Sequence, residues 1–208
     1  PAMDDALYDI ESMRRFAGID LSTDTVPDET TLLNFRHLLE RHHLGEKFFV
    51  EIGKHLETQG LSVQQGTIVD ATLIAASPST KNKDRQRDPE MSQTKKGNQY
   101  YFGMKAHIGV DKDTRLVHTV VTTTASVHDS TVMEDMLHGE EAAIYGDKAY
   151  AKDERREHYT AQGVNWKASH KARRGQLLTT HQPKENKKNN KVSALVEHPF
   201  HVLKCLWG

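Results

Sequence analysis

Cysteine is almost absent from this sequence of 208 residues, because Cys205 is the only one. An intramolecular disulfide and a zinc site built from several thiolates are therefore excluded. Long apolar runs are missing as well, and no uninterrupted stretch approaches the ~20 residues of a membrane-spanning helix. These absences favour a protein of the reducing cytoplasm that has no membrane partner.

A large net charge is also lacking, since 28 basic residues stand against 29 acidic ones. The charges are unevenly distributed, however: acidic patches lie in the first third and the last forty residues are basic. Such a basic segment is either a solvated surface or a surface that faces a polyanion. The residues expected to contact a polyanion are Lys167, Lys171, Arg173, Arg174, Lys187, Lys188, Lys191 and Lys204.

Residues 1–60 carry the three-to-four spacing that predicts helices. The first helix follows the apolar residues between Ala6 and Phe16 and ends at Gly18. Asp28 is a good N-cap for a second helix, and a third helix stops at Gly60. The buried sides predicted for these two helices are marked by Leu32, Phe35 and Leu39, and by Phe48, Ile52 and Leu56. A segment of this kind reads DNA, dimerises or caps the next domain, and these alternatives stay open.

Residues 61–208 alternate between strand and helix patterns. Strands are predicted over 67–75, 100–110, 116–124, 142–145 and 164–167, and a long polar loop over 77–98. Asp111 and Asp113 fit the turn between the second and third strands. Helices are predicted over 128–137, 151–162 and 189–206. This alternation predicts a mixed α/β sheet flanked by helices and preceded by the helical segment.

Three acids that are distant in sequence are placed in similar ways. Asp70 closes the run Gly66–Val69, Asp147 follows a short apolar strand, and Glu197 follows Ala194–Val196. Carboxylate oxygens are the ligands that Mg²⁺ prefers, so acids gathered at strand ends could hold a divalent cation. Each acid taken alone is also explained as a turn or capping residue.

The other candidate ligands have simpler explanations. Asp129 competes with Asp147 for the second position, but it precedes a helical pattern and fits an N-cap. His198 lies beside Glu197 without the further His or Cys partners that a zinc site needs. Pro199 indicates that the last helix is kinked or restarts next to Glu197.

Several of these motifs occur together in one family. The sequences DATLIAA at 70–76, YFGMKAHIGVDKDTRLVHTVVTTTASVHD at 101–129, YGDKAY at 145–150 and VEHPF at 196–200 resemble the DDE transposases of bacterial insertion sequences. The similarity is greatest to the IS-five group, which MRRFAGIDL and PDETTLLNFRHLLE also match. The resemblance implies a ribonuclease-H-like domain that cuts and joins DNA at transposon ends with Mg²⁺ or Mn²⁺. Carried over by position, the DDE triad falls on Asp70, Asp147 and Glu197.

The related signature around the glutamate is Tyr, two residues, Arg, three residues, Glu, six residues, Lys or Arg. Lys204 fills the last place, whereas Ser193 stands at the Arg position and Asn190 at the Tyr position. Serine cannot reproduce the bidentate contact of a guanidinium with phosphate. His201 and Cys205 also occupy places where basic residues are usual. These departures lead us to expect a diverged copy that is truncated at both ends.

The expected function is metal-dependent cleavage of transposon ends followed by strand transfer, in a homodimer or larger synaptic complex on double-stranded DNA. Asp70, Asp147 and Glu197 would be both the catalytic residues and the metal ligands, and their carboxylates are expected to converge on one point. Two alternatives remain open: a metal-dependent nuclease of the same fold, and a non-catalytic DNA-binding remnant of a transposase.

Overall fold

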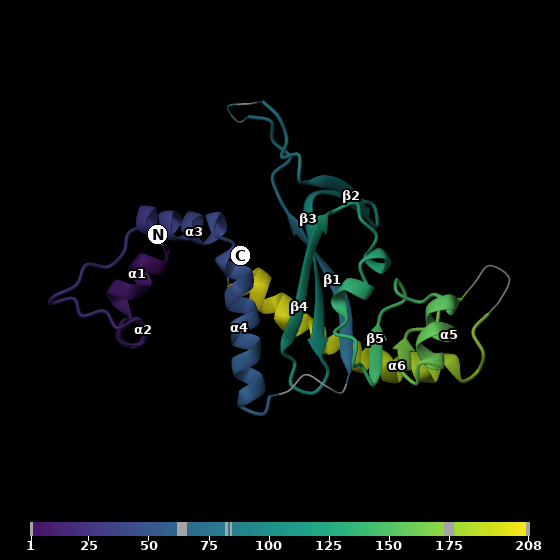
Figure 1. Cartoon of the computed structure of the whole chain (residues 1–208). Helices are drawn as coiled ribbons and strands as arrows, with labels where there is room; N and C mark the ends of the chain where they lie inside the picture. The colour runs from purple at the N-terminus through teal and green to yellow at the C-terminus, as the bar shows by residue number, and fades with distance from the viewer. Residues whose placement is uncertain (1, 62–65, 82, 84, 173–176, 207–208) are drawn as a thin grey trace. The chain divides into compact units, whose positions relative to one another are not determined.

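The computed structural model describes residues 2–61, 66–81, 83, 85–172 and 177–206. Contacts between residues divide the chain into two compact units, Pro1–Gly60 and Leu61–Gly208. The described part of the first unit contains only helices, and the second unit combines strands with helices (Figure 1).

The helices of the first unit are α1 (Ala2–Asp9), α2 (Glu11–Ala17), α3 (Glu29–Arg41) and α4 (Leu44–Thr58). The single helix expected before Gly18 is two helices, because Ile10 takes an extended conformation (φ −107°, ψ 105°) between them. Gly18 ends α2 in the left-handed conformation (φ 68°), as predicted. The N-cap prediction is confirmed too, since the Asp28 carboxylate accepts a hydrogen bond from the Thr31 backbone at 2.7 Å.

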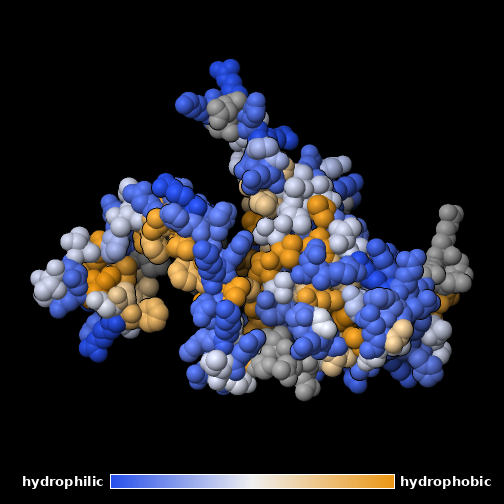
Figure 2. Space-filling model, viewed as in Figure 1, coloured by the Kyte–Doolittle hydropathy of each residue, from blue (hydrophilic) through white to orange (hydrophobic). Residues whose placement is uncertain are grey.

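The apolar sides predicted for α3 and α4 are not buried. Phe35, Phe48 and Ile52 are 55%, 53% and 59% exposed. Neither helix contains a buried residue. In Figure 2, hydrophobic side chains of this unit lie on its visible surface. The three-to-four spacing therefore predicted the helices correctly and their burial wrongly.

The strands of the second unit are β1 (Thr67–Ala75), β2 (Ser92–Lys96), β3 (Gln99–Asp111), β4 (Val117–Thr124), β5 (Ala143–Gly146) and β6 (Asn165–Ala168). They form one sheet in the order β2-β3-β1-β5-β6, with β4 also paired to β3. The long strand β3 is antiparallel to β1 along one edge, and along the other edge it pairs first with β2 and then with β4. On the far side of β1, strands β5 and β6 are parallel to it.

Strand β2 lies within the loop expected over 77–98. Its sequence Ser-Gln-Thr-Lys-Lys carries no apolar signal, because β2 is an edge strand that pairs only with β3. The prediction of an uninterrupted loop was therefore wrong. Because of this extra strand, the strand that precedes Asp147 is the fifth of the chain, whereas the sequence predicted it to be the fourth.

The helical elements of the second unit are η1 (Asp129–Thr131), η2 (Glu134–Met136), α5 (Asp153–Ala161), α6 (Gln182–Ser193), η3 (Ala194–Val196), α7 (Glu197–His201) and the π-helical turn η4 (Val202–Leu206). The helix predicted over 128–137 is two short 3-10 turns. The terminal helix begins seven residues earlier than predicted, at Gln182, because Pro183 fits its first turn.

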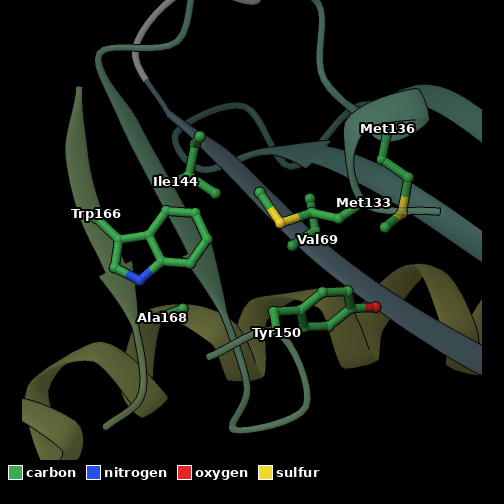
Figure 3. Close-up of a cluster of buried hydrophobic side chains, with 7 residues drawn as sticks. All are labelled: Val69, Met133, Met136, Ile144, Tyr150, Trp166 and Ala168. Carbon is green, nitrogen blue, oxygen red and sulfur yellow. The ribbon is translucent and has the colours of Figure 1, made fainter. Parts of the chain in front are cut away.

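Two apolar clusters cover the two faces of the sheet. The first core contains Val69, Met133, Met136, Ile144, Tyr150, Trp166 and Ala168 (Figure 3). The second core contains Ile68, Ile108, Val110, Val196 and Phe200. Ile68 and Val69 are neighbours on β1, so their side chains point to opposite faces of the sheet, and both are buried. Strand β1 is therefore buried on both faces.

The predicted fold class is confirmed: a mixed α/β sheet is flanked by helices, in agreement with a ribonuclease-H-like domain. The segment from η1 to η2 covers one face of the sheet, and the segment from α6 to α7 covers the other. None of the helices in the described part of the chain has the length and apolar character of a membrane span.

Candidate active site

Asp70 lies in the middle of β1 and not at its end. The strand continues to Ala75, and Asp70 stands opposite Ile108 of β3. Because side chains alternate along a strand, Asp70 shares the face of Ile68, which lies in the second core with Val196. Strand β5 pairs with only the first two residues of β1. Asp70 is therefore on the part of β1 that lies beyond this pairing, on the side covered by the C-terminal helical segment.

Asp147 is the first residue after β5. The parallel pairs Thr67↔Ile144 and Ile68↔Tyr145 have an offset of 77 residues, so the same register continued by two residues sets Asp70 level with Asp147. The register therefore sets Asp70 on β1 level with Asp147 just after the neighbouring parallel strand β5.

A tight turn holds Asp147 after the strand. The backbone N–H of Ala149 donates to Asp147 Oδ1 at 2.7 Å, and that of Tyr150 donates to the Asp147 carbonyl at 3.3 Å. The turn also inserts the Tyr150 ring beneath β1, where Figure 3 shows it below Val69. Gly146 makes this possible, since an added Cβ would lie 3.1 Å from Tyr150 Cδ2 and 3.2 Å from Val69 Cγ2.

Glu197 is the first residue of α7 and its side chain is exposed. The chain stays helical here (φ −62°, ψ −27°) but tightens into the 3-10 turn η3 just before the glutamate. This irregularity puts Pro199 in the first turn of a restarted helix, where a missing N–H is tolerated. The restart predicted from Pro199 is therefore confirmed. Val196, next to Glu197, is buried in the second core and anchors this part of the helix.

The pKa of Asp70 is raised mainly by its burial and further by the other two acids. Burial raises the pKa of Asp70 to about 7, with the nearby charges of Asp147, Glu197 and Asp129 adding to the rise and a hydrogen bond from the Ala71 N–H opposing it. A carboxyl with this pKa is held in a field of like charge, which a bound cation would relieve. The residues that raise it include both sequence-predicted partners of Asp70.

The chemistry of the donor set fits a hard divalent cation, because all three side chains offer carboxylate oxygens. One oxygen of Asp70 accepts from Ala71 at 2.8 Å and one of Asp147 accepts from Ala149. The second oxygen of each accepts no hydrogen bond from the described residues. The predicted convergence on one point is absent, however: in the described part of the chain no three His, Cys, Asp or Glu side chains form a group that could hold a metal ion.

Asp129 is not the N-cap that its position suggested. His128 caps η1, its Nδ1 accepting a hydrogen bond from the Ser130 backbone at 3.2 Å. Asp129 instead accepts from Lys105 Nζ at 2.8 Å, and the same ammonium donates to the Val127 carbonyl at 2.7 Å. Lys105 was not singled out from the sequence, because nothing in the local pattern reveals a partner 24 residues away.

The other acids behave as predicted. Asp111 is a turn residue, since its Oδ1 accepts from the backbones of Asp113 and Thr114 at 3.0 and 2.7 Å. Asp113 lies on the same turn and forms an ion pair with Lys112 at 3.3 Å. Neither acid is needed at the candidate site.

The predicted basic residues are distributed over several elements. Lys187, Lys188 and Lys191 are exposed on α6, and Lys204 is exposed on η4. Lys167 is half-buried on β6, and Lys171 follows that strand and lines a cavity of about 460 Å³ with Arg156 and His170. Arg173 and Arg174 lie outside the described residues.

The residues at the two divergent signature positions have different environments, because Asn190 is exposed on α6 and the Ser193 hydroxyl is buried. Asn190 accepts a hydrogen bond from the Ser169 hydroxyl. The Ser193 hydroxyl is buried and has no hydrogen-bond partner among the described residues. The chain thus places two small polar groups where the family signature has an aromatic ring and a guanidinium.

Tyr150 was also missed by sequence reasoning, although it ends the YGDKAY motif. Its hydroxyl is buried without a hydrogen-bond partner in the described part of the chain. Burial raises the pKa of the phenol, and the charges of Asp70, Asp129 and Asp147 raise it further. Its position next to the aspartates was the available signal.

Comparison with known families gives one match for this chain. Residues 61–208 match the family model described as transposase DDE domain. The match covers β1 to η4, so it includes all three acids and the whole sheet.

Proposed function

Because the chain belongs to the transposase DDE domain family, we propose that it cuts transposon ends and joins them to target DNA in the cytoplasm. We assign it to the IS-five group on the motifs DATLIAA and YGDKAY. The proposed activity is supported by the register that sets Asp70 level with Asp147, which directly follows β5. The charge of Glu197 also raises the pKa of the Asp70 carboxyl.

Asp70, Asp147 and Glu197 are proposed as the catalytic residues and as the ligands of Mg²⁺ or Mn²⁺. A divalent ion held there would supply Lewis-acid activation of an oxygen nucleophile and stabilisation of the leaving oxygen. Strand β1 positions Asp70, the turn after β5 positions Asp147, and Glu197 is exposed at the start of α7.

The chemistry consists of two phosphoryl transfers. In the first, a water oxygen bonds to the phosphorus at the transposon end, and the bond from phosphorus to the 3′ oxygen breaks. In the second, the released 3′-hydroxyl attacks a target phosphodiester, whose own 3′ oxygen leaves with a proton. No covalent intermediate with the protein is required, and no side chain acts as a nucleophile.

The basic residues are proposed to contact the DNA backbone. Exposed lysines on α6 and η4 lie in the helical segment that carries Glu197, so DNA bound to them would run close to the acids. Contacts of this kind depend on salt and little on sequence. Lys167, Lys171, Arg173 and Arg174 belong to the same proposed surface.

Residues 1–60 are proposed as a DNA-binding or dimerisation region within a homodimer or larger synaptic complex. The exposed apolar side chains of α3 and α4 support this role, because a helix face of this kind is usually covered by a partner. Phe48→Ser together with Ile52→Ser should then lower the molecular mass measured by sedimentation. An unchanged mass would remove these helices from the assembly interface.

A second candidate function is a non-catalytic DNA-binding remnant. Ser193 favours it, because its buried hydroxyl stands where the family signature has a phosphate-binding guanidinium. A nuclease of the same fold is the third possibility, and it would cut DNA without joining ends.

A strand-transfer assay with labelled transposon ends separates these functions. A transposase gives joined product with Mg²⁺, a nuclease gives cut product alone, and a remnant gives neither. Asp147→Asn should abolish both products, whereas Asp113→Asn should leave them unchanged because Asp113 belongs to a remote turn. Joined product from the Asp147 variant would remove that residue from the site.

A further inference from the structure

An open groove of about 520 Å³ runs along one side of α6, next to the turn that holds Asp147. Lys148, Lys187, Asn190 and Lys191 provide its polar walls, and Leu178, Pro183 and Ala194 provide apolar contacts. Lys148 did not stand out in the sequence, because it lies outside the basic C-terminal segment. In the view of Figure 2 the region of α5 and α6 is mostly hydrophilic.

The groove has the charge of an anion-binding surface. Its lining contains three lysines and no acidic residue. All three lysines are exposed, and none forms an ion pair with another described residue. Exposed ammonium groups at i and i+4 on one helix, here Lys187 and Lys191, repel one another slightly and so favour a shared anionic partner.

The groove leads toward the proposed catalytic acids. Lys148 directly follows Asp147, and Ala194 precedes Glu197 by three residues. From Lys187 to Glu197 the helical segment advances by ten residues, or about 15 Å. At ~3.4 Å of axial rise per nucleotide, about four nucleotides would fit along this length.

We propose that this groove binds the phosphodiester backbone of the DNA strand that enters the acid site, with Lys148, Lys187 and Lys191 as its phosphate contacts. The proposal rests on the proposed function, because it takes the direction of the strand from Asp147 and Glu197. It narrows the basic surface predicted from the sequence to one side of α6 and adds Lys148 to it.

Strand β2 offers a control pair of equal charge. Lys95 and Lys96 are exposed like Lys187 and Lys191, but they do not line the groove and are not among the residues proposed to contact DNA. Reversing either pair to glutamate changes the net charge by the same amount. Any difference between the two variants therefore reports position and not overall charge.

The experiment measures binding of a fluorescein-labelled 20-nucleotide DNA to the full chain by fluorescence anisotropy, in EDTA and at several salt concentrations. Lys187→Glu with Lys191→Glu should weaken binding at least tenfold and lower the salt dependence by about two counterions. Lys95→Glu with Lys96→Glu should stay within about twofold of the original chain. Equal losses of affinity in the two double variants, or no loss in Lys187→Glu with Lys191→Glu, would overturn the assignment of the groove.

Two further measurements keep the result unambiguous. If the Glu variants unfold at a lower temperature, Lys187→Ala with Lys191→Ala is compared with Lys95→Ala with Lys96→Ala, and the same order of affinities is expected. A poly-glutamate peptide that competes as well as DNA would overturn the assignment to a nucleic acid. The rise in melting temperature with Mn²⁺ tests the acids separately. If the original chain shows no such rise but Lys187→Glu with Lys191→Glu still weakens DNA binding, the proposed function is rejected and the groove is retained.

Discussion

Asp70 is the residue at which the proposed chemistry and the stability of the fold meet. Burial and neighbouring acids raise its pKa to about 7, from an ordinary value of 3.8. Between these two values the folded protein holds a proton on Asp70 that the unfolded chain has released. The free energy of unfolding therefore falls as pH rises from about 4 to about 7, by about 1.4 kcal/mol for each unit of the shift.

Asp70→Asn should remove this pH dependence. Urea unfolding in metal-free buffer at pH 5 and pH 8 should show the original chain losing a few kcal/mol relative to the variant between the two conditions. The comparison isolates Asp70, because His118 is present in both proteins. Burial lowers the pKa of His118 to about 4, so its own effect is opposite in sign. An identical pH dependence in the two proteins would contradict the raised pKa.

A second prediction concerns the buried hydroxyl group of Tyr150. Its ring packs in the first core, but its buried hydroxyl has no partner among the described residues. A buried polar group without a hydrogen bond lowers stability, so Tyr150→Phe should leave the metal-free protein as stable or more stable by about 1 kcal/mol. Tyr150→Leu serves as the control and should lower stability, because it leaves a cavity. A clear loss in the Phe variant would show that the hydroxyl does have a partner.

At the scale of single elements, the sequence predicted structure best where local pattern and tertiary environment agree. The bounds of β1 are the predicted ones, because its β-branched residues suit a strand buried on both faces. The segment after His128 carries apolar residues at helical spacing, yet it forms two 3-10 turns. Its methionines fill the first core, and the Lys105–Asp129 ion pair holds its start, so long-range contacts decide its shape.

In the candidate site too, local sequence patterns predicted some features, and long-range contacts decide the others. Asp70, Asp147 and Glu197 were suggested by their positions after short apolar runs and by the resemblance to DDE transposases. The parallel register explains why two of them lie level. The role of Asp129 could not be predicted, because Lys105 reaches it from another strand. The buried hydroxyls of Tyr150 and Ser193 were equally hidden, since burial without a partner has no local signature.

Gly109 tests how closely β3 packs against its neighbours. A Cβ at this position would collide with the Met136 carbonyl oxygen and lie 2.7 Å from His118 Cε1. Gly109→Ala should therefore lower the free energy of unfolding by about 1–3 kcal/mol, measured with urea. Gly53→Ala is the control: its Cβ meets nothing within 4 Å, so α4 should gain up to about 1 kcal/mol from the better helix former. Equal stability of the Gly109 variant and the original chain would mean that η2 readily moves away from β3.

At the scale of the whole molecule, the chain combines a helical unit with a mixed α/β unit that belongs to the transposase DDE domain family. The sequence predicted the helices of the first unit but not their exposure, because an amphipathic pattern does not say which surface covers it. In the second unit each face of the sheet has its own covering segment, and Asp70 and Asp147 both lie beyond the same end of the β1–β5 pairing. The proposed chemistry requires these acids and Glu197 to bind one divalent ion together.

The melting temperature with and without Mn²⁺ tests that claim most directly. An ion that binds only the folded state adds about 2.7 kcal/mol at 100 times its Kd, which corresponds to about 5–10 °C for a chain of this size. The original chain should show this rise, Asp147→Asn should lose it while remaining folded, and Asp129→Asn should keep it from a lower starting temperature because Lys105 loses its partner. A rise that survives in Asp147→Asn and vanishes in Asp129→Asn would contradict the account.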